Sequence, residues 1–171
     1  LRTVPKVGGT KDVRIERVRA LSPTHVLVNM DENRRETVEE LAAFVPNIIV
    51  THPGTPLDNL ALFHLLGGVF GAERAALQLG EDLRAALAEA SALRTEVPDE
   101  AVLYLIWREP GMTVARDTYI AATLAAVGWH TLPEVAGGET GAARYPAFTW
   151  DAPWLLGVER VLLSTEPYRF R

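Results

Sequence analysis

An indole and a guanidinium stand side by side at Trp107 and Arg108, directly after a predicted strand. A Glu-Pro dipeptide and a glycine follow them, which is typical of a turn. A flat apolar ring beside a fixed cation suits a large planar or anionic ligand. The structural alternative is that Trp107 covers the core while Arg108 pairs with Glu109 or Asp117.

Polar and aromatic side chains also follow the other predicted strands. In parallel α/β sheets, ligands gather outside the carboxyl ends of the strands, because loops and helix N-termini converge there. The loops after the four predicted strands all hold such residues. The candidate ligand-binding residues are therefore Asn29, Glu32, His52, Trp107, Arg108, Arg116 and Tyr168.

His52 could contact a ligand or exchange a proton, although a lone histidine in a turn is often an ordinary solvated residue. The other three histidines share no metal-ligand spacing with it, and the HExxH pattern is absent. Gly8 and Gly9 precede a threonine but match neither phosphate-loop pattern. We therefore expect no intrinsic metal or cofactor.

Composition narrows the class of protein. The 171 residues are 48% hydrophobic and 23% charged, as in an ordinary globular protein. The net charge of −5 disfavours nucleic acid as a partner. No apolar run approaches the roughly 20 residues of a membrane-spanning helix. The chain has no cysteine, which fits either an intracellular protein or an exported bacterial one.

Strand-like and helical segments alternate, which predicts an α/β fold with largely parallel sheets. Asp12, Asn33 and Asp117 are expected to cap helices. The helix after Pro56 is apolar on nearly every side, so most of it should be buried. Residues 129–148 read mostly as loop, and Thr149 as the cap of a short helix. The predicted strands are 26–30, 47–51, 101–106 and 161–164.

The most prominent helix runs from Glu73 to about Leu93 and would span about 30 Å, which suits a strut between two lobes. Gly80 could break it locally. We expect an N-terminal lobe over 1–72, a connecting helix over 73–96 and a C-terminal lobe over 97–171. The chain begins with Leu1 and stops just after a predicted strand, so we expect the fold to continue at both ends.

Several stretches of the chain resemble one family. They are VGGTKDVRIERVRALSPTHVLVNMDENRRETVEEL (7–41), VLYLIWREPGMTVARDTYIAATLAAVG (102–128), RYPAFTW (144–150) and VERVLLSTEPYRF (158–170). In order and character they are similar to the substrate-binding proteins of cobalamin and iron-chelate ABC importers, the helical-backbone metal receptors. The resemblance covers about two thirds of the chain.

The resemblance implies two α/β lobes joined by one long helix, with a corrinoid or ferric siderophore held between them and delivered to an ABC permease. It implies that Trp107 stacks on the ligand and adds Tyr145 to the ligand-binding set. It also implies that Glu36 and Asp151 dock to permease arginines. An extracytoplasmic location follows from the family, and homodimerisation stays open.

The sequence departs from the family at two places in the expected cleft. His52 stands where a tyrosine is expected, and Gly111 where relatives often carry a bulky aromatic side chain. Two other functions therefore stay open. One is an intracellular α/β enzyme that holds an anion with Arg108 and Arg116 and uses His52 as acid or base. The other is a degenerate lobe pair that serves as an interaction module.

Overall fold

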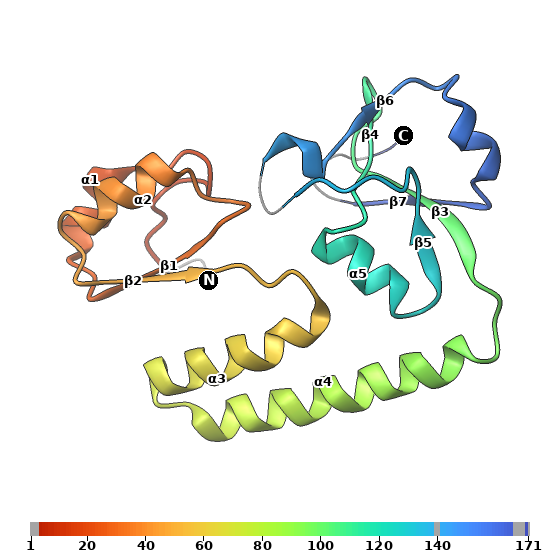
Figure 1. The fold of residues 1–171 in the computed structure, drawn as a ribbon. Helices are drawn as coiled ribbons and strands as arrows, with labels where there is room; N and C mark the ends of the chain where they lie inside the picture. Colours follow the sequence, from red (N-terminus) through yellow and green to blue (C-terminus); the bar gives the residue numbers. More distant parts are fainter. Residues whose placement is uncertain (1–3, 139–140, 166–169, 171) are drawn as a thin grey trace. The chain divides into compact units, whose positions relative to one another are not determined.

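The computed structural model describes residues 4–138, 141–165 and 170, and Figure 1 shows its ribbon. The chain forms two compact units, Leu1–His52 and Pro53–Arg171. Each unit combines helices with parallel strands, so the predicted α/β class is confirmed. In the part of the chain that is described, no helix is both long and apolar enough to cross a bilayer.

The first unit is a two-stranded parallel sheet covered by two helices. Strand pairing runs in register from His25 and Asn47 to Asn29 and Thr51. The β-branched run at 47–51 forms its strand as predicted, because such side chains fit a pleated surface. The elements are α1 (Ile15–Leu21), β1 (His25–Asn29), α2 (Arg35–Ala42) and β2 (Asn47–Thr51).

One apolar cluster holds this unit together. Val18 of α1 and Leu41 of α2 are almost fully buried, together with Val45 in the following turn. Val26 of β1 and Ile48 of β2 pack against them. The cluster fixes both helices on the sheet, and the parallel register then brings the carboxyl ends of β1 and β2 together.

The predicted caps of these two helices are wrong. The residues that precede α1 and α2 are Arg14 and Arg34, and neither makes a side-chain capping hydrogen bond. Asn33 instead donates to the carbonyl of Thr10 and accepts the amide of Asn29, both at 2.9 Å. Those two bonds hold Asn33 in the loop before α2, where it links two loops rather than starting a helix.

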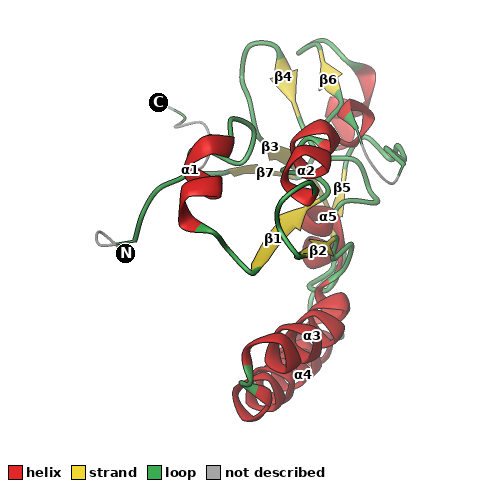
Figure 2. Ribbon diagram, turned by 90° about the vertical axis from the view of Figure 1, so that its left-hand side faces the viewer, coloured by secondary structure: helices red, strands yellow, loops and turns green. Residues whose placement is uncertain are grey.

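The second unit begins with a helical hairpin, and Figures 1 and 2 both show α3 alongside α4. Its elements are the short 3-10 turn η1 (Pro56–Asp58), α3 (Asn59–Phe70) and α4 (Glu73–Arg94). α4 is continuous through Gly80, which lies against α3: an added Cβ would be 3.6 Å from a methyl of Leu60. The predicted long helix is confirmed, and the helix does not break at this glycine.

The prediction that most of α3 is buried is wrong. Gly67 is its one buried residue, while Leu65 and Phe70 are 44% and 60% exposed. The elements that pack most against α3 are α4 and η1, and they cover only part of its circumference. The helix α3 is apolar on all sides, and because its neighbours cover only part of it, some of its apolar side chains remain exposed.

The rest of the second unit is built on a three-stranded parallel sheet in the order β5-β3-β7, beside the antiparallel pair β4 and β6. Val102 and Leu103 of β3 are fully buried on both faces of the central strand. The elements are β3 (Glu100–Leu105), β4 (Gly111–Met112), α5 (Tyr119–Ala125), β5 (Trp129–Thr131), η2 (Ala142–Arg144), β6 (Ala147–Phe148), η3 (Pro153–Gly157) and β7 (Arg160–Leu163).

One expectation for this region needs correction and another is confirmed. Residues 129–148 are mostly outside helices and strands in the described part of the chain, although they also contain the short elements β5, η2 and β6. The short helix expected after Thr149 is the 3-10 turn η3, which begins at Pro153. The strands over Glu100–Leu105 and Arg160–Leu163 lie within one residue of their predicted bounds.

Candidate functional site

The carboxyl edge of the β1–β2 sheet carries the candidate residues of the first unit. Asn29 ends β1, and its side-chain oxygen accepts the amide of Asp31 at 2.9 Å. Glu32 is exposed and accepts the hydroxyl of Thr10 at 3.0 Å. Asn29 therefore helps to hold the loop in its conformation. Glu32 is more accessible to a ligand than Asn29.

His52 follows β2 at the same edge and faces Asp31. Its Nε2 atom lies 3.6 Å from a carboxylate oxygen of Asp31, and the two side chains are 24% and 18% exposed. That nitrogen is enclosed and has no hydrogen-bond partner among the described residues. A half-buried imidazole with an unsatisfied nitrogen is not the ordinary solvated histidine of the alternative interpretation.

In the second unit, Trp107 stands on a closed turn after β3. Its indole N–H donates to the carbonyl of Glu109 at 2.9 Å, and its carbonyl accepts the amide of Met112 at 3.0 Å. The peptide bond between Glu109 and Pro110 is cis. Trp107 is 40% exposed, so part of the residue remains accessible to a ligand.

Two arginines extend this site. Arg108 and Arg116 are exposed, and neither forms an ion pair with a residue that the structure describes. The alternative in which Arg108 pairs with Glu109 or Asp117 therefore does not hold. Both guanidinium groups remain available to an anionic ligand.

Asp117 is held by the loop that follows β5. Its two carboxylate oxygens accept the amides of Gly137 and Gly138, each at 2.8 Å. These bonds, that of Gly137 first, hold the pKa of the Asp117 carboxyl below its usual value. The prediction that Asp117 caps the helix is wrong, since the hydroxyl of Thr118 accepts the amide of Ala121 instead.

Arg144 holds the same loop from inside the fold, and we call the contacts among Asp117, Gly137, Gly138 and Arg144 the Asp117 latch. It is 2% exposed, and its guanidinium donates to the carbonyl of Gly138 at 2.8 Å and to that of Asp117 at 3.3 Å. Gly137 lies so close that an added Cβ would be 2.4 Å from the Arg144 Cα. Sequence reasoning missed Asp117 and Arg144 in these roles. Its one available signal was the Gly-Gly pair.

Backbone hydrogen bonds also fix the segment that contains Tyr145. The amide of Ala115 donates to the carbonyl of Arg144 at 2.8 Å, and the amide of Thr113 donates to that of Pro146 at 3.1 Å. Tyr145 is thus half-buried within a paired segment that continues into β4 and β6. The Asp117 latch, the backbone pairing of residues 113–115 with 144–146 and the Trp107 turn all lie in the second unit.

The remaining candidate residues are spread over the chain. Glu36 is exposed in the first turn of α2, and Asp151 is exposed just before η3. A hydrogen bond with the side chain of Thr149 lowers the pKa of Asp151. Tyr168 lies outside the described residues. Over that described part, no group of three or more metal-ligating side chains occurs.

Comparisons with known proteins point to one family. A family model described as periplasmic binding protein matches residues 1–140. The periplasmic vitamin B12 binding protein BtuF of Vibrio cholerae has a similar structure, with a TM-score of 0.78 at 13% identity over 93% of this chain and 60% of that chain. No curated protein matches the sequence.

Two periplasmic heme-binding proteins are also similar. HutB of Vibrio cholerae has a TM-score of 0.75 at 19% identity, over 95% of this chain and 62% of its own. RhuT from Roseiflexus sp. RS-1 has a TM-score of 0.71 at 21% identity, over 86% of this chain and 56% of its own. At such identities the likeness shows the fold alone, and the chain spans about 60% of the length of these structures.

Proposed function

The chain belongs to the periplasmic binding protein family, and we propose that it is the substrate-binding component of an ABC importer for a metal chelate of the corrinoid or haem type. The observation that carries the proposal is the Trp107 turn. Its indole N–H donates to the carbonyl of Glu109, its backbone carbonyl accepts the amide of Met112, and the residue is 40% exposed; the adjacent Arg108 forms no ion pair with a described residue.

A macrocycle fits the chemistry of this turn. Corrin and porphyrin rings are flat and largely apolar, and they carry anionic or amide side groups at their rims. An indole face offers stacking, worth about 0.5–1.5 kcal/mol beyond the area that it buries. Arg108 and Arg116 offer charge-assisted hydrogen bonds to carboxylates at the rim. The two heme-binding proteins and BtuF support this ligand class, whereas none of the three structures compared supports a siderophore.

His52 adds a metal-directed group in the first unit. A neutral imidazole is a good ligand for iron and cobalt. Its enclosed Nε2 lies 3.6 Å from the carboxylate of Asp31 and has no hydrogen-bond partner among the described residues. We propose that the accessible part of the His52 ring contacts the chelate and that Asp31, beside the enclosed Nε2, holds the ring in place. Asn29 and Glu32 would line the same edge.

Delivery would use the two exposed acids. Glu36 and Asp151 are exposed, and the hydrogen bond with Thr149 lowers the pKa of Asp151, which favours its ionised form. We propose that they dock to basic residues of the permease outside the cytoplasm. Charge reversal at Glu36 or Asp151 should then reduce uptake by cells that carry the importer, while the affinity of the isolated protein for its ligand stays unchanged.

Fluorescence titration tests the ligand site. The full chain is titrated with hemin, cyanocobalamin and dicyanocobinamide, and quenching of tryptophan emission is followed. Trp107→Phe should remove most of the quenching, and Trp107→Ala should weaken binding by about tenfold. Trp129→Phe is the matched control, because Trp129 pairs with Glu100 at the opposite end of β3. Equal effects of the variants at Trp107 and Trp129 would contradict the assignment.

A further inference from the structure

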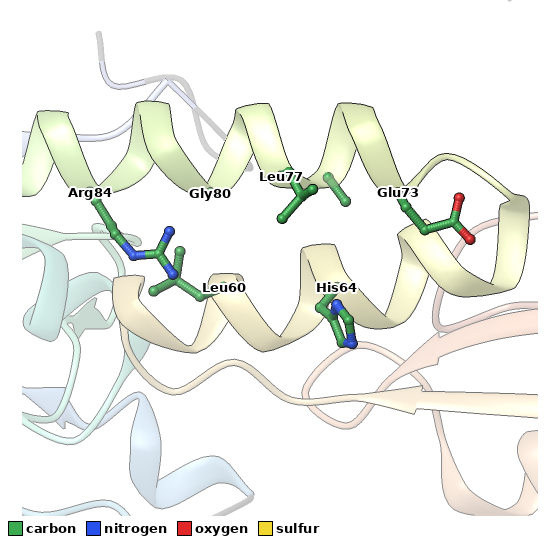
Figure 3. Close-up of a pocket in the computed structure, with 7 residues that line it drawn as sticks. Leu60, His64, Glu73, Leu77, Gly80 and Arg84 are labelled. Carbon is green, nitrogen blue, oxygen red and sulfur yellow. The ribbon is translucent and has the colours of Figure 1, made fainter.

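A groove between α3 and α4 is not explained by ligand binding. It has a volume of about 300 Å³ and lies entirely within the second unit. Figure 3 shows that Arg84 stands at one end of the groove and Glu73 at the other, with Leu77 and Gly80 between them on α4. Leu60 and His64 of α3 line the facing side.

The groove exposes apolar surface and unpaired charge together. Leu77 is 67% exposed, which is unusual for a leucine on a groove wall. Glu73 and Arg84 form no ion pair or side-chain hydrogen bond with any residue in the described part of the chain. The Arg84 guanidinium lies over Gly80, 3.5 Å from where a Cβ would stand.

The spacing of these four residues is symmetric. Glu73, Leu77, Gly80 and Arg84 follow one another at intervals of four, three and four residues, so they form one stripe along the helix. Glu73 and Arg84 are equally far from the point midway along the stripe, and so are Leu77 and Gly80. With a two-fold axis at that point, each Glu73 faces an Arg84 of the second copy, and each Leu77 faces a Gly80.

We propose that the α3–α4 groove is a homodimerisation surface in which the α4 helices of two copies pack antiparallel. Glu73 of each copy pairs with Arg84 of the second copy. Leu77 of each copy packs over the second copy's Leu60 and the buried Gly80, and the Arg84 guanidinium, which covers Gly80 in the single chain, swings towards the acid. Two-fold interfaces use the same patch twice, which is why self-complementarity favours a second copy over a foreign partner.

Analytical ultracentrifugation of the full chain over a wide range of concentration tests this proposal. We expect a reversible dimer. Leu77→Glu should raise its dissociation constant by about a hundredfold, because two leucines lose their burial. Leu79→Glu is the matched control: Leu79 is also exposed on α4 but points to another side of the helix, and the dimer should persist.

Charge exchange makes the test specific. Glu73→Arg and Arg84→Glu should each weaken self-association by about tenfold, because like charges then meet at both ends. A mixture of the two variants should form a heterodimer of full strength, since every facing pair is complementary again. A monomer at all concentrations, or a dimer that Leu77→Glu or the charge reversals leave intact, would overturn the proposal. No chelate is needed, so the result is independent of the proposed function.

Discussion

The ring of Phe148 occupies the space that a side chain at position 111 would need. An added Cβ on Gly111 would lie 2.7 Å from Cζ of Phe148, and the two residues are directly paired in the β4–β6 ladder. The rings of Trp150 and Trp154 meet Phe148 edge-on, each with centroids 5.1 Å away. Relatives are expected to carry an aromatic side chain at position 111. Here Phe148, on the neighbouring strand, fills that space.

This contact predicts that Gly111→Ala destabilises the second unit by about 1–3 kcal/mol, because Trp150 and Trp154 leave the Phe148 ring little room to move away. Urea unfolding measures the loss. The double variant Gly111→Ala with Phe148→Leu should be more stable than the sum of the two single changes predicts. Strict additivity of the two changes would show that the contact is not tight.

A pair of glycines in the helical hairpin should respond in opposite directions. A Cβ at Gly67 would lie 2.7 Å from the Cβ of Ala76, so Gly67→Ala should destabilise by about 1–3 kcal/mol. A Cβ at Gly80 meets only ordinary contacts, at 3.5 Å and beyond. Gly80→Ala should therefore stabilise the fold by about 0.5–1 kcal/mol through helix propensity. If the urea midpoints of both variants shifted in the same direction from that of the parent protein, this packing would be contradicted.

Regular elements with a strong local signal were predictable from the sequence. The β-branched run at 47–51 and the long helix from Glu73 lie where the pattern placed them. β5 was not predictable, because its three residues are a strand only through pairing with Glu100 to Val102. Burial of α3 was overestimated, since a sequence shows which side chains are apolar but not how much of a helix its neighbours cover.

The candidate site divides in the same way. The positions of Trp107 and His52 follow from strand ends, which a hydrophobic pattern locates. The long-range hydrogen bonds that hold the surrounding loops cannot be predicted in this way. Arg144 reaches Asp117 across 27 residues, and Asn33 reaches Thr10 across 23, so no local pattern reveals either contact. Such hydrogen bonds also explain why Asp117 and Asn33, both ordinary capping residues, cap no helix here.

The latch around Asp117 predicts a specific acid sensitivity. Its pKa is lowered in the folded chain by the amides of Gly137 and Gly138, so its contribution to stability is complete above the unfolded value of about 4. The contribution is lost as pH falls from there through the lower folded value. Asp117→Asn should be less stable than the parent at pH 7, and this difference should shrink towards zero on acidification.

Thermal unfolding of both proteins between neutral pH and pH 3 measures that difference. Other carboxyls with lowered pKa, including Asp99 and Glu100, titrate in both proteins and therefore cancel in the comparison. A stability difference that is independent of pH would mean that the charge of Asp117 is not what holds the loop of Gly137 and Gly138.

Direct binding of a metal macrocycle is the claim on which the proposed function depends. The decisive measurement is size-exclusion chromatography of the full chain with hemin, cyanocobalamin or dicyanocobinamide, with the visible absorbance of the protein peak recorded. We predict that one of these ligands elutes with the protein at one molecule per chain and that His52→Ala together with Trp107→Ala abolishes the co-elution. Passage of all three ligands as free compounds would contradict the proposed function.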